Sequence, residues 1–115
     1  MNGCGIMSDD LPPMKKMLKL TIRVRSRDEH NGKPISDLLL FLFKEKGISG
    51  ATVLQGVRGY GLRGNARVDV LGLSVNLPVV IETVDTEEKV DSVLADVKKI
   101  VGTNGIITLE EVLVF

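Results

Sequence analysis

The sequence is poor in cysteine and in aromatic residues: it has one cysteine, Cys4, three phenylalanines, one tyrosine and no tryptophan. One thiol cannot form a disulfide framework or a cysteine metal site within the chain. It fits a reducing compartment, so we expect a cytoplasmic protein. Basic and acidic side chains balance at 15 each, which gives no electrostatic basis for binding nucleic acid or a membrane surface. No run approaches the ~20 apolar residues of a membrane span, so we expect no membrane insertion.

What the chain does have is aliphatic side chains. Apolar residues make up 43% of its 115 residues, enough for one domain whose core is built from valine, leucine and isoleucine. Residues 1–14 contain Pro12 and Pro13 and are expected to form a flexible tail, with the domain over residues 15–115.

The spacing of apolar residues predicts the order of the elements. Strict alternation of apolar and polar residues begins at Lys16, and strands are predicted over residues 16–27, 51–57, 77–84 and 106–115. Stripes at helical spacing, each ended by a glycine, predict helices over residues 34–46 and 85–101. This order predicts an α+β fold: a ferredoxin-like βαββαβ sandwich, with an antiparallel sheet and two helices on one face.

The predicted strands carry apolar residues on both faces. Val79 and Ile81 alternate with Val80, and Val53 lies next to Leu54. Two helices can cover only one face of the sheet, so the other face is expected to be buried by further copies of the chain. Leu40 and Phe41 also fall outside the apolar stripe of the first helix, which leaves open either an interface there or a few exposed apolar residues.

A glycine-rich stretch follows the second predicted strand. The letters GYGLRG at residues 59–64 match G-x-G-x-x-G, but no helix or βαβ unit surrounds them, so a dinucleotide-binding site is not expected. The stretch carries Arg58, Arg63 and Arg67. Glycine backbone N–H groups and arginine side chains can hold a phosphate or a carboxylate. The alternative is a flexible loop with solvated arginines.

The only histidine, His30, follows Asp28 and Glu29. These three residues could bind a metal if symmetry brought several copies together, and the alternative is a solvated turn. No nucleophile with a neighbouring base can be named, so catalytic residues are not predicted and the chain is not expected to be an enzyme.

Several blocks, in order, resemble an uncharacterised PII-like family known as domain of unknown function 190. The blocks are HNGKP, GISGATV, GVRGYG and LPVVIE, at residues 30–34, 47–53, 56–61 and 77–82. The resemblance covers residues 15–115. It implies a ferredoxin-like fold of unassigned function.

A more distant resemblance, to nitrogen-regulatory PII signalling proteins, implies a function. Thr52-Val53 followed by VRGYG at residues 57–61 is similar to the strand that enters the regulatory loop of those proteins. PII proteins are homotrimers that bind adenine nucleotides between subunits and report through the loop after the second strand. The resemblance implies a homotrimeric signalling protein whose unknown partner is an enzyme or a membrane transporter. The alternative is a metal-responsive trimer that resembles the divalent-cation tolerance proteins, with His30, Asp28 and Glu29 as ligands.

Carried over to this chain, the resemblance assigns a ligand site to two segments. Gly59, Tyr60 and Gly61 match the loop base beside the nucleotide cleft, and Arg58 and Arg63 are the basic residues beside them. The second phosphate loop of PII proteins, a Gly-Asp-Gly-Lys run, corresponds here to the run Gly102, Thr103, Asn104, Gly105, Ile106. Without the lysine, the resemblance implies AMP or ADP as ligand rather than ATP, and no required cofactor.

Overall fold

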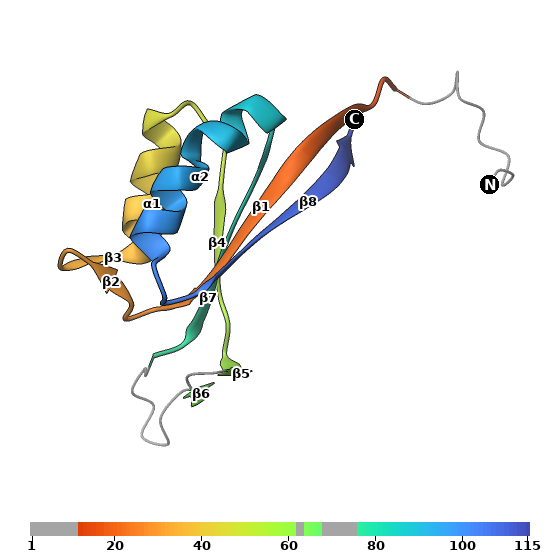
Figure 1. Ribbon diagram of the computed structural model, residues 1–115. Coiled ribbons are helices and arrows are strands. Elements are labelled where there is room, and N and C mark those ends of the chain that lie inside the picture. Colours follow the sequence, from red (N-terminus) through yellow and green to blue (C-terminus); the bar gives the residue numbers. More distant parts are fainter. Residues whose placement is uncertain (1–11, 62–63, 68–75) are drawn as a thin grey trace, which may run out of the picture.

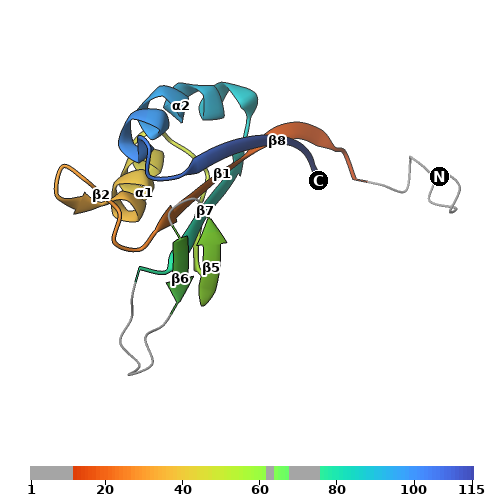
Figure 2. The ribbon, with the colours of Figure 1, turned by 60° about the horizontal axis from the view of Figure 1, so that its bottom comes forward.

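The computed structural model describes residues 12–61, 64–67 and 76–115, and its main feature is a four-stranded antiparallel sheet (Figure 1). The strands lie in the order β4-β7-β1-β8 and are β1 (Lys15–Arg25), β4 (Thr52–Gln55), β7 (Pro78–Asp85) and β8 (Ile106–Val114). Two helices, α1 (Ile35–Glu45) and α2 (Glu87–Val101), lie side by side on one face of this sheet (Figures 1 and 2). The predicted ferredoxin-like α+β fold is confirmed.

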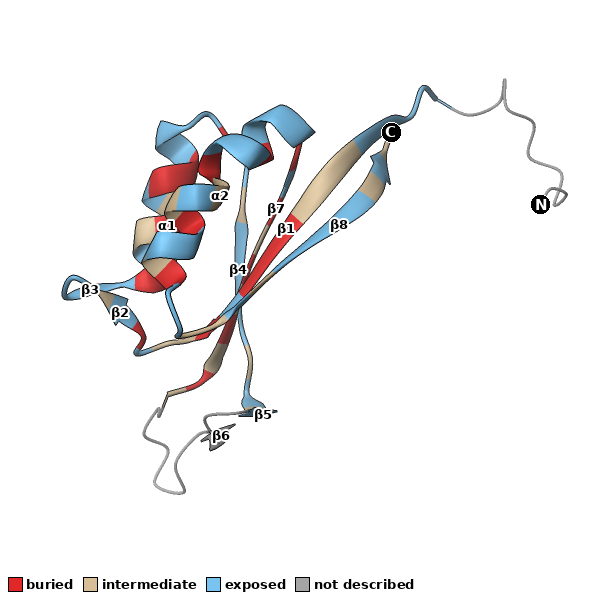
Figure 3. Cartoon of the chain, viewed as in Figure 1, coloured by how far each residue is buried: buried red, intermediate tan, exposed pale blue. Residues whose placement is uncertain are grey.

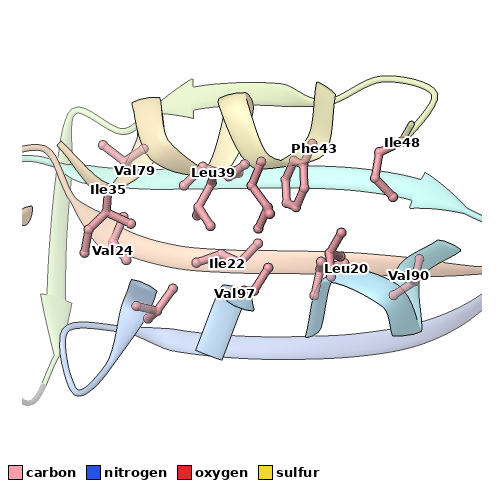
Figure 4. Close-up of a cluster of buried hydrophobic side chains, with 14 residues drawn as sticks. Leu20, Ile22, Val24, Ile35, Leu39, Phe43, Ile48, Val79, Val90 and Val97 are labelled. Atoms are coloured by element: carbon pink, nitrogen blue, oxygen red, sulfur yellow. The ribbon is translucent and has the colours of Figure 1, made fainter. Parts of the chain in front are cut away.

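The core lies between the helices and one face of the sheet, mainly of β1 and β7 (Figure 4). Alternate side chains of β1 point into it, and Leu20 and Ile22 have no exposed surface. The helices fill the other side through residues at i, i+3 or i+4 spacing, which keeps them on one face. The helical core residues are Ile35, Leu39, Leu42, Phe43, Val90, Val93, Val97 and Val101.

Two short hairpins, neither of them predicted from the sequence, lie outside the main sheet. One joins β2 (Glu29–His30) to β3 (Lys33–Pro34), within a segment expected to be a loop. Asn31 and Gly32 both have positive φ, 53° and 79°, as a tight two-residue turn requires, but strands of two residues leave no alternation to recognise. The other hairpin pairs β5 (Arg58–Gly61) with β6 (Gly64–Arg67) inside the glycine-rich stretch.

The strand predicted over residues 51–57 is shorter than expected. It ends at Gln55, and Gly56 then donates its backbone N–H to the Pro78 carbonyl at 2.8 Å. Val57 lies beyond the strand and is exposed.

The second face of the main sheet has no helix over it and mixes apolar with charged side chains. Exposed apolar residues on it include Leu54, Val84 and Ile106, from three different strands, and β8 is exposed along most of its length (Figure 3). Lys19 lies opposite Val84 in the strand register, and its Nζ is 3.5 Å from Glu82 Oε2. The predicted apolar character of both faces is therefore present in the single chain.

The described residues contain no helix that is both long enough and apolar enough to cross a bilayer. Residues 1–11 of the predicted tail lie outside the described residues.

One buried carboxylate fixes the start of α2. Asp85, only 3% exposed, accepts hydrogen bonds from the Ser49 backbone N–H at 2.8 Å, the Ser49 hydroxyl at 2.9 Å and the Thr86 N–H at 2.7 Å. Burial raises the pKa of Asp85, but the hydrogen bonds from Ser49 and Thr86 outweigh it, so the pKa is lowered overall. Thr86 then caps the helix by accepting the Lys89 N–H.

Replacing Asp85 with asparagine should lower the free energy of unfolding at pH 7 by about 1.5–3 kcal/mol, because hydrogen bonds to a charged acceptor are lost. The folded-state pKa lies below the unfolded value of about 3.9. The stabilisation is therefore complete above that value and disappears as the pH falls through the folded-state pKa. Urea denaturation of Asp85→Asn and wild type at fixed protein concentration should show a difference that shrinks at low pH. The exposed Asp91→Asn should show no such difference, and a pH-independent gap would contradict the charge-based account.

Candidate functional site

One end of the main sheet carries a pocket of about 310 Å³. Four chain segments line it: the end of β1, the start of β7, the β5 strand and the turn between α2 and β8. The volume is at the lower end of the range for small-molecule sites. The lining residues are Arg23, Val24, Arg25, Arg58, Gly59, Tyr60, Gly61, Pro78, Thr103, Asn104, Gly105 and Ile106.

Glycines let the backbone lie against Pro78 on one side of the pocket. A Cβ atom placed on Gly59 would lie 2.9 Å from Pro78 Cγ, and one placed on Gly56 would lie 3.0 Å from the same atom. The first distance is shorter than real Cβ atoms show and the second is at the tight limit, so the ring of Pro78 occupies space that side chains would need. The glycines therefore set the close approach of β5 to the start of β7.

Gly105 holds the opposite side of the pocket against β1. A Cβ atom there would overlap the Arg23 carbonyl oxygen and lie 2.7 Å from Val24 Cγ1. Gly102, with φ of 58°, ends α2 in the left-handed region, and Asn104 donates its backbone N–H to the Val101 carbonyl at 3.0 Å. The turn after α2 is thus fixed at both ends, and it presents Thr103 and Asn104 to the pocket.

The charge in the pocket has one sign. Arg23 and Arg25 come from β1 and Arg58 from β5, and the described lining includes no aspartate or glutamate. Pro78 and Ile106 give the pocket an apolar part, and Tyr60 is 89% exposed beside it. This arrangement suits an anion attached to an apolar or flat group.

The two segments assigned to a ligand site from the sequence lie around this one pocket. Arg58, Gly59, Tyr60 and Gly61 line it from β5, and Thr103, Asn104 and Gly105 line it from the turn before β8. Arg63 lies outside the described residues. Their role in binding a ligand stays a prediction.

Two further lining residues, Arg23 and Arg25 of β1, were not predicted as site residues. In the sequence they fall only on the polar side of the alternating strand predicted over residues 16–27. The pairing of Arg23 with Ile106 and of Arg25 with Pro78 places both arginines beside segments far away in the sequence. No local sequence pattern identifies these two arginines as site residues, because their position at the pocket depends on which distant residues they pair with in the sheet.

The proposed metal ligands are not brought together within one chain. The Asp28 carboxylate accepts the Arg25 backbone N–H at 2.7 Å in a tight turn, and Asp28 is buried. Glu29 and His30 are successive residues of β2, so their side chains point to opposite sides. In the part of the chain that the structure describes, no three histidine, cysteine, aspartate or glutamate residues lie close enough to hold a metal ion. A site built from several copies of His30 stays a prediction.

Comparison with known proteins gives the family. The chain matches DUF190, described as "Uncharacterized ACR, COG1993", over residues 17–114. It is 42% identical to a UPF0166 protein of Methanocaldococcus jannaschii, over 85% of this chain and 91% of that one. It is also 42% identical to a UPF0166 protein of Aquifex aeolicus, over 85% and 90% of the two chains. The chain therefore belongs to the DUF190 (UPF0166) family.

Solved structures share the fold. CPII of Thiomonas intermedia K12, a nitrogen regulatory PII-like protein solved with ADP, AMP and bicarbonate, matches with a TM-score of 0.70 at 16% identity, covering 89% of this chain and 91% of that one. The GlnK–ATP complex of B. subtilis matches with a TM-score of 0.56 at 19% identity, covering 84% and 82%. The chain therefore has the fold of these PII-like proteins, and the predicted membership of the DUF190 family is confirmed.

Replacing Gly105 with alanine should lower the free energy of unfolding by about 1–3 kcal/mol, because the new methyl group forces β8 and the end of β1 apart. Gly50→Ala is the matched control, since no atom lies within 4 Å of a Cβ there and its φ is not positive. Urea denaturation of both variants measures the effect. Equal stability of Gly105→Ala and wild type would contradict the close packing of the turn on β1.

Proposed function

We propose that this protein is a PII-like homotrimeric regulator that binds a small anionic ligand, an adenine nucleotide, between its subunits. The ligand state would be reported to a protein partner, an enzyme or a membrane transporter, by the segment after β4. The regulator would act in the cytoplasm. The main support is the pocket, which is lined by both β5 and the turn before β8. Its described lining contains arginines and no carboxylates.

The ligand is inferred from the chemistry of the pocket and supported by its structural relatives. Arginine side chains and glycine-rich backbone suit phosphate groups, and the apolar wall suits a nucleobase. CPII was solved with ADP and AMP, and GlnK with ATP. AMP or ADP remains the expected ligand, since the position after Gly105 is Ile106 and not a lysine.

The pocket favours binding and regulation over catalysis. General acid–base catalysis needs a side chain that can take or give a proton near neutral pH, and nucleophilic catalysis needs an activated hydroxyl, thiol or amine. The lining residues described above include no histidine, cysteine, aspartate, glutamate or lysine. Thr103 has no base beside it in that lining. Regulation requires only that the ligand favours one state of the protein over another.

The uncovered sheet face supports an oligomer. Leu54, Val84 and Ile106 are 53%, 38% and 60% exposed on that face, and Lys19 and Glu82 offer charges of both signs between them. A second copy would bury these apolar residues and could pair with the charges.

A thermal-shift series with AMP, ADP, ATP, bicarbonate and divalent metal ions tests the ligand. A nucleotide at a hundred times its dissociation constant should add ~2.7 kcal/mol, seen as a rise of several degrees in melting temperature. Arg58→Gln should weaken that binding about tenfold or more, because a charge-assisted hydrogen bond is lost. Lys33→Gln, a charge removed from the β3 hairpin, is the control. A shift with metals alone would contradict the nucleotide proposal and favour the metal-responsive alternative.

Size-exclusion chromatography with light scattering tests the oligomer. The wild type should elute with three times the monomer mass. Val84→Glu should dissociate it, because a carboxylate would have to be buried in the apolar contact. Phe41→Glu, on the solvent side of α1, should leave the mass unchanged. Dissociation by Phe41→Glu and not by Val84→Glu would place the interface on the helical layer, and a monomeric wild type would contradict the trimer.

A further inference from the structure

We propose that Arg23 is a second phosphate-binding residue of the pocket, and that together with Arg58 it makes the site selective for a nucleoside diphosphate over a monophosphate. This inference rests on the proposed function, since it names the ligand class of the same site.

The position of Arg23 follows from the strand register. Arg23 alternates with the buried residues Ile22 and Val24, so its side chain leaves β1 on the face away from the helices. It lies directly opposite Ile106, the first residue of β8, which follows Gly105 of the turn. Arg23 thus stands beside the turn of residues 103–105, on a central strand whose backbone is paired on both sides.

Arg23 and Arg58 are available to a ligand. Both line the pocket, and in the described residues neither has an ion pair or a side-chain hydrogen bond. Arg25 also lines the pocket but makes other interactions within the protein, so it is not counted. Two unpaired guanidinium groups around one pocket, with no carboxylate in its described lining, leave positive charge that is available to an anionic ligand.

The two arginines come from different strands, which points to two phosphate groups. A guanidinium group binds one phosphate in a bidentate manner, and a diphosphate offers each arginine a group of its own. A monophosphate has one such group and less negative charge, so it leaves an arginine without a full partner. The apolar residues Pro78 and Ile106 of the same pocket, which lie opposite Arg25 and Arg23 in the sheet, suit the uncharged part of the ligand.

Isothermal titration of the full-length protein with AMP and ADP tests the assignment. The wild type should bind ADP about tenfold or more tightly than AMP, and Arg23→Gln should remove most of that difference. Lys15→Gln is the matched control: it removes one positive charge from the same face of β1, eight residues or ~26 Å away. Circular dichroism and a melting curve check that each variant is folded, which the exposure of Arg23 predicts.

The outcomes separate the two proposals. Equal affinity of the wild type for AMP and ADP, or an equal loss of both in Arg23→Gln, overturns the role of Arg23 and leaves nucleotide binding intact. A similar loss of the preference for ADP in Lys15→Gln would show that the preference comes from general charge attraction, and would also overturn the role of Arg23. If the wild type binds ATP but neither AMP nor ADP, this inference fails alone. If it binds none of the three nucleotides, the proposed function fails with it.

Discussion

The structure depends on the position of β1 in the middle of the sheet. It pairs with β7 on one side and β8 on the other, so its register fixes which residues of three strands share a face. Side chains alternate along a strand, so a shift of β1 by one residue against its neighbours would move Leu20 and Ile22 out of the core. The polar side chains that alternate with them would then face the helices. The same constraint that buries the leucine and isoleucine therefore also fixes where Arg23 projects.

The elements that could be predicted from sequence are those with a long regular pattern. The alternation through Leu20 and Ile22 identified β1, and the stripe through Val90, Val93 and Val97 identified α2, because tertiary packing requires one continuous apolar face. The hairpins β2–β3 and β5–β6 were missed, since their strands have only two and four residues. Such short strands show no recognisable alternation of apolar and polar residues. In the β2–β3 hairpin, only the turn residues Asn31 and Gly32 indicate the structure.

The candidate site could be predicted only in part, for a similar reason. The segment around Gly59 stands out as a glycine-rich stretch, whereas the segment around Gly105 was assigned only through the resemblance to PII proteins. In both, the backbone meets another chain segment too closely for a Cβ atom. Arg23 is one of 15 basic residues and follows no motif. Its relevance comes from lying opposite Ile106, and a cross-strand partner 83 positions away cannot be read from local spacing.

The pocket and the uncovered sheet face are not independent surfaces. Ile106 lines the pocket and is 60% exposed on the face that we propose to be covered by other copies, and Arg23 projects from that same face. In such a trimer, a ligand held by Arg23 would lie at the edge of the subunit contact and not in a cavity remote from it. Ligand binding would then change the charge beside the contact, so the two equilibria would be linked in both directions. The proposed regulator needs that linkage, and Arg23 on β1 would provide it by lying beside both the ligand and the subunit contact.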